Sequence, residues 1–487
     1  MAPSRLDWRQ TQTNEEIQVS GDRPRTAPDS RPLKPDSDIY FVALSRREYG
    51  VGIAASPTMA SNATQVGERT RRIVGLRLLP FVFILYIVNY IDRTNLAYAA
   101  LGMSRELGFS DHVFSLGAGV FFVSYLALQI PGALLVELWS ARRMISATMI
   151  AWGSLTVLTA LVHTPSQLYL ARFVLGAAEA GFFPGVIVYL SHWFIFEDRA
   201  KATSNFMGAI PLSAVLGSPL AGWILGRAWL GFAGWRWLFV VEGAPAILLG
   251  VVAFFFLTDW PREAAWLAPE QRQWLEQKLR EETPPSRTAI TVWQAMRSPI
   301  IVWMAALTFL AYIGQYTFVF WFPTMLKRLS GFTDMRVGVL GALPFLAGFL
   351  AMQFNGWHSD KQAERRWHSA IPLFVAGIAY FFLSIPGHSR LLTMALFTVA
   401  GVLTAYLSTF WAIPTQILSH AEAATAVGLI NSVGSIAGFA GPYIFGYVYT
   451  RTGGSFSLGL RLVMFAVLTA GLMILRIPKT SKTANQT

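Results

Sequence analysis

The sequence has no cysteine in its 487 residues, and only 14% of its residues are charged. The absence of cysteine excludes disulfide bonds and thiolate metal sites. The low charge, together with 54% apolar residues and a positive mean hydropathy, is hard to reconcile with a water-soluble globular protein. The histidines are scattered without HExxH-type spacing and no nucleophile motif is present, so we do not expect an enzyme. The composition predicts a membrane protein.

Long apolar runs dominate the chain. A helix needs roughly 20 mostly apolar residues to cross a bilayer, and about twelve such runs are present. We therefore expect an all-α membrane protein with twelve transmembrane helices. The runs lie near residues 75–98, 112–136, 144–162, 167–191, 202–226, 237–257, 299–323, 337–356, 370–386, 391–413, 425–449 and 458–475.

Basic residues gather on alternate connections between these runs. By the positive-inside rule such connections face the cytoplasm, which places both termini there. The expected location is the cell (inner) membrane. Basic loops that face anionic lipid also explain the net charge of +12 without a nucleic-acid partner. The residues are Arg69, Arg71, Arg72, Arg142, Arg143, Arg199, Lys201, Lys361, Arg365, Arg366, Lys479 and Lys482.

A polar insert separates the runs into two groups of six. Its segment "LAPEQRQWLEQKLREE" has Pro269 at a helix start, followed by apolar residues at amphipathic spacing. The polar start of the chain lacks any apolar run, and Met59 is an alternative start of the native protein. The expected parts are a disordered cytoplasmic tail (1–68), a six-helix bundle (69–257), a cytoplasmic linker with a short amphipathic helix (258–298), a second six-helix bundle (299–476) and a cytoplasmic tail (477–487).

The two halves repeat a loop pattern. "GALLVELWSARR" follows the second run and "GWHSDKQAERR" follows the eighth, each with a small residue, an acid and a basic pair. This pattern resembles the loop signature of the major facilitator superfamily. The resemblance implies that the loops form a cytoplasmic latch between the halves, and the alternative is that they only anchor the chain in the membrane. The latch residues would be Glu137, Arg142, Arg143, Asp360, Lys361, Arg365 and Arg366.

We single out four ionisable residues inside apolar runs of the first half, because each costs at least ~3 kcal/mol at bilayer depth. Asp92 and Arg93 are adjacent, so they point about 100° apart and cannot face one partner. Arg172 and Glu179 are seven residues apart and share a helix face, roughly 10 Å from each other. The alternatives are a snorkelling role for Arg172, a packing or capping role for Asp92, and a pairing charge without a role in transport for Arg93. The second half offers only neutral candidates: Tyr312, Gln315, Tyr316, Thr409, Trp411, Asn431 and Ser435.

Several stretches, among them "NYIDRTNLAYA", "RFVLGAAEAGFFPGVIVYLSHWF" and "GLINSVGSIAGFAGPYIFGY", resemble the anion:cation symporters of that superfamily, especially bacterial carriers of tartrate, sugar acids and phthalate. The resemblance implies that Asp92 and Glu179 couple transport to protons. It also implies a substrate site, with arginines that hold the carboxylate or tune the acids. That site would contain Tyr90, Arg93, Tyr125, Arg172, Trp411 and Asn431.

We therefore expect proton-coupled symport of a small organic anion by alternating access. Ile210 and Ser435 depart from the sugar-acid carriers, which favours a tartrate-like dicarboxylate or an aromatic carboxylate over a polyhydroxy sugar acid. No metal and no cofactor is expected besides the co-transported proton, and the fold usually works as a monomer. The alternatives are a proton-coupled export antiporter for drugs or metabolites and a non-transporting receptor.

Prolines inside the runs predict bends where the freed carbonyl groups face the bundle. Such bends would suit a carrier whose halves rock against each other. The prolines are Pro131, Pro184, Pro211, Pro219, Pro414 and Pro442.

Overall fold

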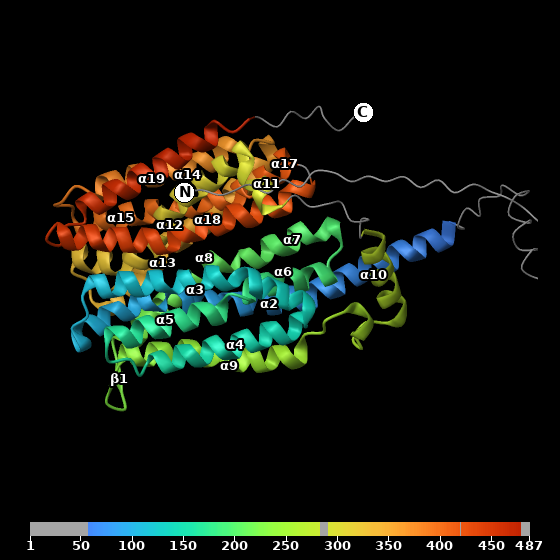
Figure 1. Cartoon of the computed structure of the whole chain (residues 1–487), viewed down its shortest axis with the longest axis horizontal. Coiled ribbons are helices and arrows are strands. Elements are labelled where there is room, and N and C mark those ends of the chain that lie inside the picture. Colours follow the sequence, from blue (N-terminus) through green and yellow to red (C-terminus); the bar gives the residue numbers. More distant parts are fainter. Residues whose placement is uncertain (1–56, 283–290, 419, 479–487) are drawn as a thin grey trace, which may run out of the picture. The chain divides into compact units, whose positions relative to one another are not determined.

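The computed structural model describes residues 57–282, 291–418 and 420–478 (Figure 1). The chain divides into two units, residues 1–60 and 61–487, and the architecture below is that of the second. Most of the predicted N-terminal tail and nearly all of the C-terminal tail lie outside the described residues. Helix α2 begins at Pro57, upstream of the expected bundle start, and the indole of Trp274 lies against its Gly67.

The prediction of an all-α membrane protein with twelve spans in two halves is confirmed. In the described ranges, eleven helices are long and apolar enough to cross a membrane, and α4 holds the place of the third span. The spans of the first half are α2 (Pro57–Leu107), α3 (Asp111–Leu138), α4 (Ala141–Thr159), α5 (Pro165–Glu179) with α6 (Phe182–Trp193), α7 (Phe196–Met207) with α8 (Ala209–Leu225), and α9 (Gly234–Phe256).

The second half follows the same plan. Its tenth span is divided into short pieces that include one 3-10 turn, η2. The spans are α12 (Pro299–Ser330), α13 (Asp334–Gln362), α14 (Arg366–Leu383), the pieces α15 (Arg390–Gly401), η2 (Val402–Tyr406), α16 (Leu407–Phe410) and α17 (Ala412–Ile417), then α18 (His420–Arg451) and α19 (Ser457–Leu475).

Three of the six expected proline bends are interruptions of a span. A proline lacks the N–H that would bond the carbonyl four residues upstream. In each of the three cases that carbonyl belongs to the last residue of the preceding helix or to its C-cap residue. The pairs are Pro184 with Ala180, Pro211 with Met207, and Pro414 with Phe410. The other three, Pro131, Pro219 and Pro442, lie within continuous helices.

Short elements lie at the two ends of the bundle. The linker contains the 3-10 turn η1 (Pro261–Glu263), the expected amphipathic helix α10 (Pro269–Glu282) and the additional helix α11 (Val292–Arg297). Strands β1 (Ala228–Trp229) and β2 (Phe232–Ala233), which the sequence did not predict, form a hairpin. We call the end that carries this hairpin the hairpin end, and the opposite end, where α10 lies, the linker end (Figure 1).

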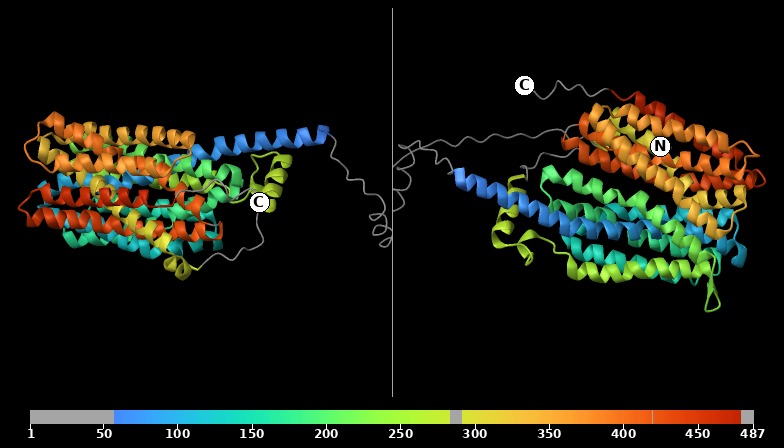
Figure 2. Two further views of the ribbon diagram at one scale, coloured as in Figure 1. Left: turned by 90° about the horizontal axis from the view of Figure 1, so that it is seen from above. Right: turned by 180° about the vertical axis from the view of Figure 1, so that it is seen from behind.

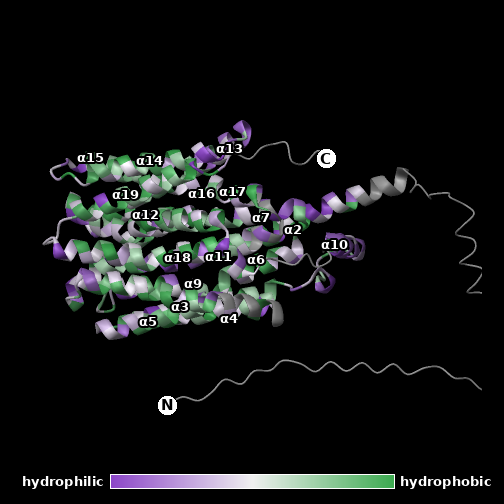
Figure 3. Cartoon of the chain, turned by 45° about the horizontal axis from the view of Figure 1, so that its top comes forward, coloured by the Kyte–Doolittle hydropathy of each residue, from purple (hydrophilic) through white to green (hydrophobic). Residues whose placement is uncertain are grey.

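The helices run side by side from one end to the other (Figure 2). Hydrophobic residues occupy the middle of the helices, and hydrophilic ones gather on α10 and at the end of α13 (Figure 3). Large apolar side chains such as Leu170 and Phe255 are exposed on the outside of the bundle, which suits contact with lipid.

The halves meet most closely at the hairpin end. Helix α8 packs on α13 and α3 packs on α18. A Cβ atom on Gly222 would lie 2.7 Å from the Cα atom of Gly338, so only glycine allows these two backbones to approach so closely.

Candidate functional site

The interrupted fourth span places Glu179 at the centre of the first half. Helix α5 starts at a capping box, in which Thr164 Oγ1 accepts from the Gln167 N–H (3.3 Å) and Gln167 Oε1 accepts from the Thr164 N–H (3.1 Å). It ends at Glu179, just before the break associated with Pro184. The Glu179 side chain is fully buried, so its carboxyl group needs partners inside the protein.

Arg93 is the charged partner of Glu179. Its Nη2 and Nε atoms donate to Glu179 Oε2 at 2.7 Å and 3.3 Å. Asn89 Nδ2, one turn earlier on α2, donates to the same oxygen at 3.1 Å. The second oxygen, Oε1, is buried without a hydrogen-bond partner among the described residues. The ion pair thus uses only one of the two carboxyl oxygens.

Asp92 turns away from that pair, as the 100° step between neighbouring helix positions requires. Its Oδ2 accepts from Thr156 Oγ1 on α4 at 2.9 Å, and its Oδ1 accepts from Asn95 Nδ2 at 3.0 Å. Its side chain is fully buried. Asp92 therefore sits among neutral hydrogen-bond donors, whereas Glu179 is bonded to a cation.

Arg172 is buried without a hydrogen bond. None of its three guanidinium nitrogens has an acceptor in the described part of the chain, although its surface is fully covered. The guanidinium lies 4.7 Å from the ring centroid of Phe121, and the Arg93 guanidinium lies 5.5 Å from the same ring. Two arginines therefore flank one aromatic ring, and one of them keeps all its donors free for an acceptor.

Tyrosines surround the Arg93 guanidinium. The rings of Tyr90 and Tyr125 lie 5.5 Å and 4.8 Å from it. From the second half, Tyr316 packs edge-on against Phe122 with 4.8 Å between ring centroids. Tyr316 was one of the neutral candidates of the second half, but it was not predicted to belong to the substrate site.

The other two predicted substrate residues belong to the second half. Trp411 lies at the break between α16 and α17, half-buried, with its ring 5.3 Å from that of Phe410. Asn431 is half-buried on α18. Within the described ranges, neither residue forms a hydrogen bond or an ion pair with the four charged residues of the first half.

The first copy of the predicted latch contacts its own half. The backbone N–H of Arg142 donates to Asp259 Oδ1 at 2.9 Å, and Ser140 Oγ donates to Asp259 Oδ2 at 2.7 Å. Asp259, at the start of the linker, thus caps α4, a role that the sequence analysis missed. Arg143 is exposed, and the side chain of Glu137 lies outside what the structure describes.

The second copy also contacts its own half. Arg365 pairs with Asp360 at 2.5 Å, and Arg366 Nη1 donates to the Ile477 carbonyl at 2.7 Å, beyond the end of α19. Lys361 Nζ lies 5.5 Å from the Trp357 ring. Among the described residues, no predicted latch side chain forms a hydrogen bond or an ion pair with the opposite half.

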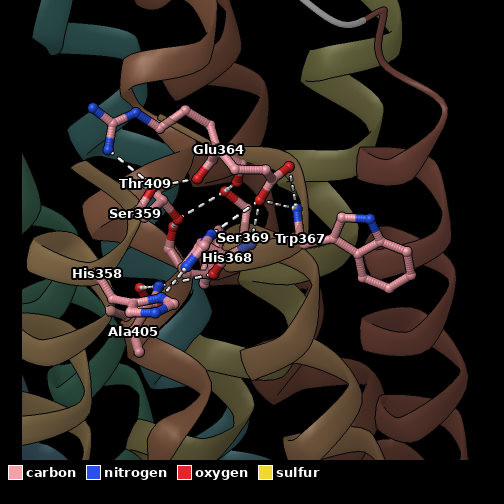
Figure 4. A network of polar contacts seen from close by, with 11 residues as sticks. His358, Ser359, Glu364, Trp367, His368, Ser369, Ala405 and Thr409 are labelled. Carbon is pink, nitrogen blue, oxygen red and sulfur yellow. Dashed lines mark hydrogen bonds and ion pairs between the residues drawn. The ribbon is translucent and has the colours of Figure 1, made fainter. Parts of the chain in front are cut away.

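A polar network lies beside this second copy (Figure 4). Glu364 accepts hydrogen bonds from the backbone N–H groups of Trp367 and His368, at 2.9 Å and 3.3 Å, and so caps α14. His368 Nδ1 lies 2.9 Å from Glu364 Oε2, and His368 Nε2 lies 2.7 Å from His358 Nδ1. Burial favours the neutral acid, but these hydrogen bonds outweigh it and hold the pKa of Glu364 below its ordinary value.

Ion pairs cross between the halves at the hairpin end. Asp334, at the start of α13, binds Lys327 of its own half and Arg105 of the first half. Asp111, at the start of α3, binds Arg328 of the second half at 2.7 Å. A cavity of about 250 Å³ lies between α2, α3 and α12 beside these pairs. Charged side chains that were not singled out from the sequence thus join the two halves at the hairpin end.

Glu242 is a further buried acid that the sequence analysis missed. It lies in the sixth span, within "FVVEGAP", and its isolation in an apolar run was a visible signal. In the described ranges, no group of three histidine, aspartate or glutamate side chains could hold a metal ion.

Known proteins provide a comparison for this arrangement. Residues 82–442 match the family described as the Major Facilitator Superfamily. The chain is 38% identical to the "Putative tartrate transporter" of Agrobacterium vitis, over 86% of this chain and 93% of that protein. It is 34% identical to the "Quinolone resistance transporter" of Acinetobacter baumannii, over 78% and 89%. The structure of a bacterial homologue of the human lysosomal transporter Spinster superposes with a TM-score of 0.67 at 20% identity, over 83% of this chain and 95% of that one.

Proposed function

Since the chain belongs to the major facilitator superfamily and is therefore a membrane transporter, we propose that it carries a small organic anion into the cell together with protons. The observation that carries this proposal is Arg172, a buried guanidinium with no hydrogen-bond acceptor. A carboxylate is the natural partner of such a group, because both are planar and can form two parallel charge-assisted hydrogen bonds.

The charges of the site favour coupling to protons. Asp92 and Glu179 balance Arg93 and Arg172, so an entering carboxylate adds an uncompensated negative charge to a buried site. A proton on one of the two acids restores the balance. A dicarboxylate would require a proton on both Asp92 and Glu179, because an unpaired buried charge is costly.

Competition for Arg93 links the proton to the substrate. In the ion pair, Glu179 occupies two of the guanidinium N–H groups. A proton on Glu179 removes the charge that holds Arg93, which can then bind the anion together with Arg172 across Phe121. Loss of the proton restores the ion pair and expels the anion.

Alternating access would expose this site to each side in turn. The cross-half ion pairs at the hairpin end and the absence of such pairs from the described latch residues support a state that is open toward the linker end. The basic loops at the linker end support an orientation in which this end lies on the cytoplasmic side of the inner membrane. Because the chain lacks cysteine, a single introduced cysteine can be labelled selectively to test this orientation. Ser455→Cys would label the hairpin end, and Glu263→Cys would label the linker end.

Tartrate is the first substrate to test, since the relative from Agrobacterium vitis carries that name. The full chain, reconstituted in vesicles, is tested with tartrate and a panel of other dicarboxylates and aromatic acids. The wild type should accumulate one of these acids when the outside is acidified. Glu179→Gln should still exchange labelled for unlabelled acid, because exchange needs no net proton movement, but should no longer accumulate it. Glu263→Gln, which removes an exposed acid of the linker, is the matched control.

Two outcomes would contradict the assignment. If Glu179→Gln accumulates the acid against its gradient, Glu179 does not couple transport to protons. If Arg93→Ala binds and carries the anion normally, Arg93 is not its anchor. Absence of transport for every acid in the panel would remove the proposed function itself.

Export of a drug is the second candidate, and the resemblance to the Acinetobacter baumannii transporter favours it. Overexpression in a susceptible bacterium decides between the two. An exporter raises the quinolone concentration needed to stop growth, whereas an uptake carrier leaves it unchanged and permits growth on the transported acid.

A further inference from the structure

Glu242 is a buried acid that the cycle above does not use. It lies in α9 with 4% of its surface exposed, and its Oε2 atom is buried without a hydrogen-bond partner among the described residues. No lysine, arginine or histidine in the described ranges forms an ion pair with it. A buried carboxyl group without a cation is costly in its charged form.

Close packing of two helices places Glu242 beside the Asp92 site. A Cβ atom on Gly243 would lie 2.8 Å from the Gly153 carbonyl oxygen and 3.1 Å from the Thr156 Cβ atom. The backbones of α4 and α9 therefore touch at the residue next to Glu242. Thr156 is the residue whose hydroxyl donates to Asp92.

The surroundings of Glu242 are acidic or neutral. Asp92 and Tyr98, both on α2, are the titratable groups that interact with it electrostatically. Tyr98 is hydrogen-bonded to Ser218 of α8, and α4 contributes the Thr156 hydroxyl. Arginines 93 and 172 act on Asp92, but the described residues place no cation against Glu242. Two carboxyl groups that repel each other in a poorly solvated site cannot both be ionised at low cost.

We propose that Asp92 and Glu242 form a carboxyl pair that shares one proton, and that Glu242 is thereby a second proton-coupling residue of the carrier. This inference rests on the proposed proton coupling, and it separates two proton sites. Glu179 binds its proton in competition with a cation, whereas the Asp92 and Glu242 pair binds its proton in competition with another acid.

The pair has a distinct place in the transport cycle. Its members belong to α2 and α9, so a movement between these helices changes how strongly they repel each other. Separation lets both carboxyl groups ionise and releases the shared proton, and approach takes a proton up again. Proton release would thus follow helix movement directly, without a change at the Arg93 ion pair.

Infrared spectroscopy tests the shared proton without any substrate. The purified full chain at neutral pH should show the carbonyl band of a protonated carboxylic acid, and Glu242→Gln should lose or shift it. Glu263→Gln is the control, because it removes an exposed acid outside the spans. If wild type and Glu242→Gln have the same carbonyl bands, the pair does not hold a proton and the proposal fails. This result is independent of whether any tested acid is transported.

Proton counting tests the coupling role. In vesicles that contain a pH-sensitive dye, Glu242→Gln should exchange tartrate within about twofold of wild type and move one proton fewer per tartrate. Asp92→Asn with Glu242→Gln together should match Asp92→Asn alone, because a shared proton can be lost only once. Unchanged proton counts and an unchanged pH profile would overturn the role. Should Glu242→Gln fail to fold, Glu242→Asp keeps the acid and must retain both the band and the wild-type proton count.

Discussion

Replacing Arg172 with methionine removes a buried guanidinium that makes no hydrogen bond within the described chain. The folded protein therefore loses no internal hydrogen bond, and the lost attraction of Arg172 to Glu179 and Asp92 is offset because a buried guanidinium no longer has to be desolvated. Replacing Arg93 is different, because Glu179 is then left buried without its cation. Breaking a buried ion pair on one side costs roughly 3–5 kcal/mol. Arg172→Met should keep the unfolding temperature, whereas Arg93→Met should lower it.

Binding should respond in the opposite way. A hydrogen bond to a charged group contributes roughly 1.5–3 kcal/mol, so loss of two bonds from Arg172 should cost about 3 kcal/mol, a factor of roughly 100 in Kd. Arg172→Lys keeps the charge without the planar fork and should lie between wild type and methionine. Thermal unfolding and calorimetric titration with tartrate measure the two effects. An unfolding temperature of Arg172→Met as low as that of Arg93→Met would refute the reasoning, because Arg172 would then be a structural residue.

Two further predictions concern the ends of the bundle. Asp334→Asn should loosen the hairpin end, because the hydrogen bonds to Arg105 and Lys327 lose their negative partner. A loss of about 1 kcal/mol in the free energy that holds the two halves together corresponds to a roughly fivefold increase in maleimide labelling of Ala100→Cys in the adjoining cavity. Unchanged labelling would contradict a role of these ion pairs in holding the halves together. Glu364→Gln should destabilise the protein by about 1 kcal/mol, as loss of a helix cap does. The pKa of Glu364 lies below its ordinary value of 4.5. The difference in stability between wild type and Glu364→Gln, measured in thermal scans, should therefore be complete above pH 4.5 and disappear as the pH falls through the lower pKa. A difference that persists in acid would contradict a cap that depends on the charged carboxylate.

The span pattern was predictable because it depends on local chemistry. Each apolar run must pair its backbone groups within a helix to enter lipid, so length and composition alone indicate a span. The different directions of Asp92 and Arg93 were equally predictable, since the 100° step between neighbouring residues follows from helix geometry. Helix α10 was indicated by Pro269 and the amphipathic spacing that follows it.

Partners distant in sequence were not predictable. Asp334 begins α13, where it resembles an ordinary helix-start acid, and its partner Arg105 lies more than two hundred residues away. Asp259 caps α4 from the linker for the same reason. Glu242 was visible as an acid in an apolar run, but its relation to Asp92 depends on the contact between Gly153 and Gly243, which only the packing of α4 on α9 creates. The hairpin was missed because its turn rests on Leu230 in a left-handed conformation, with φ of 52°, which leucine rarely adopts.

The gap between α5 and α6 gives the fourth span a pivot. The ring of Pro184 removes the hydrogen bond to the Ala180 carbonyl group across the gap. In the proposed cycle, we expect the linker-side piece to change its angle while the hairpin-side piece keeps its axis. Glu179 sits at the pivot, and Arg93 sits on the unbroken helix α2. In that cycle, a change of angle that closes the linker end would strain the hydrogen bonds between these two side chains. The conformation of the carrier would then depend on whether Arg93 binds Glu179 or the substrate.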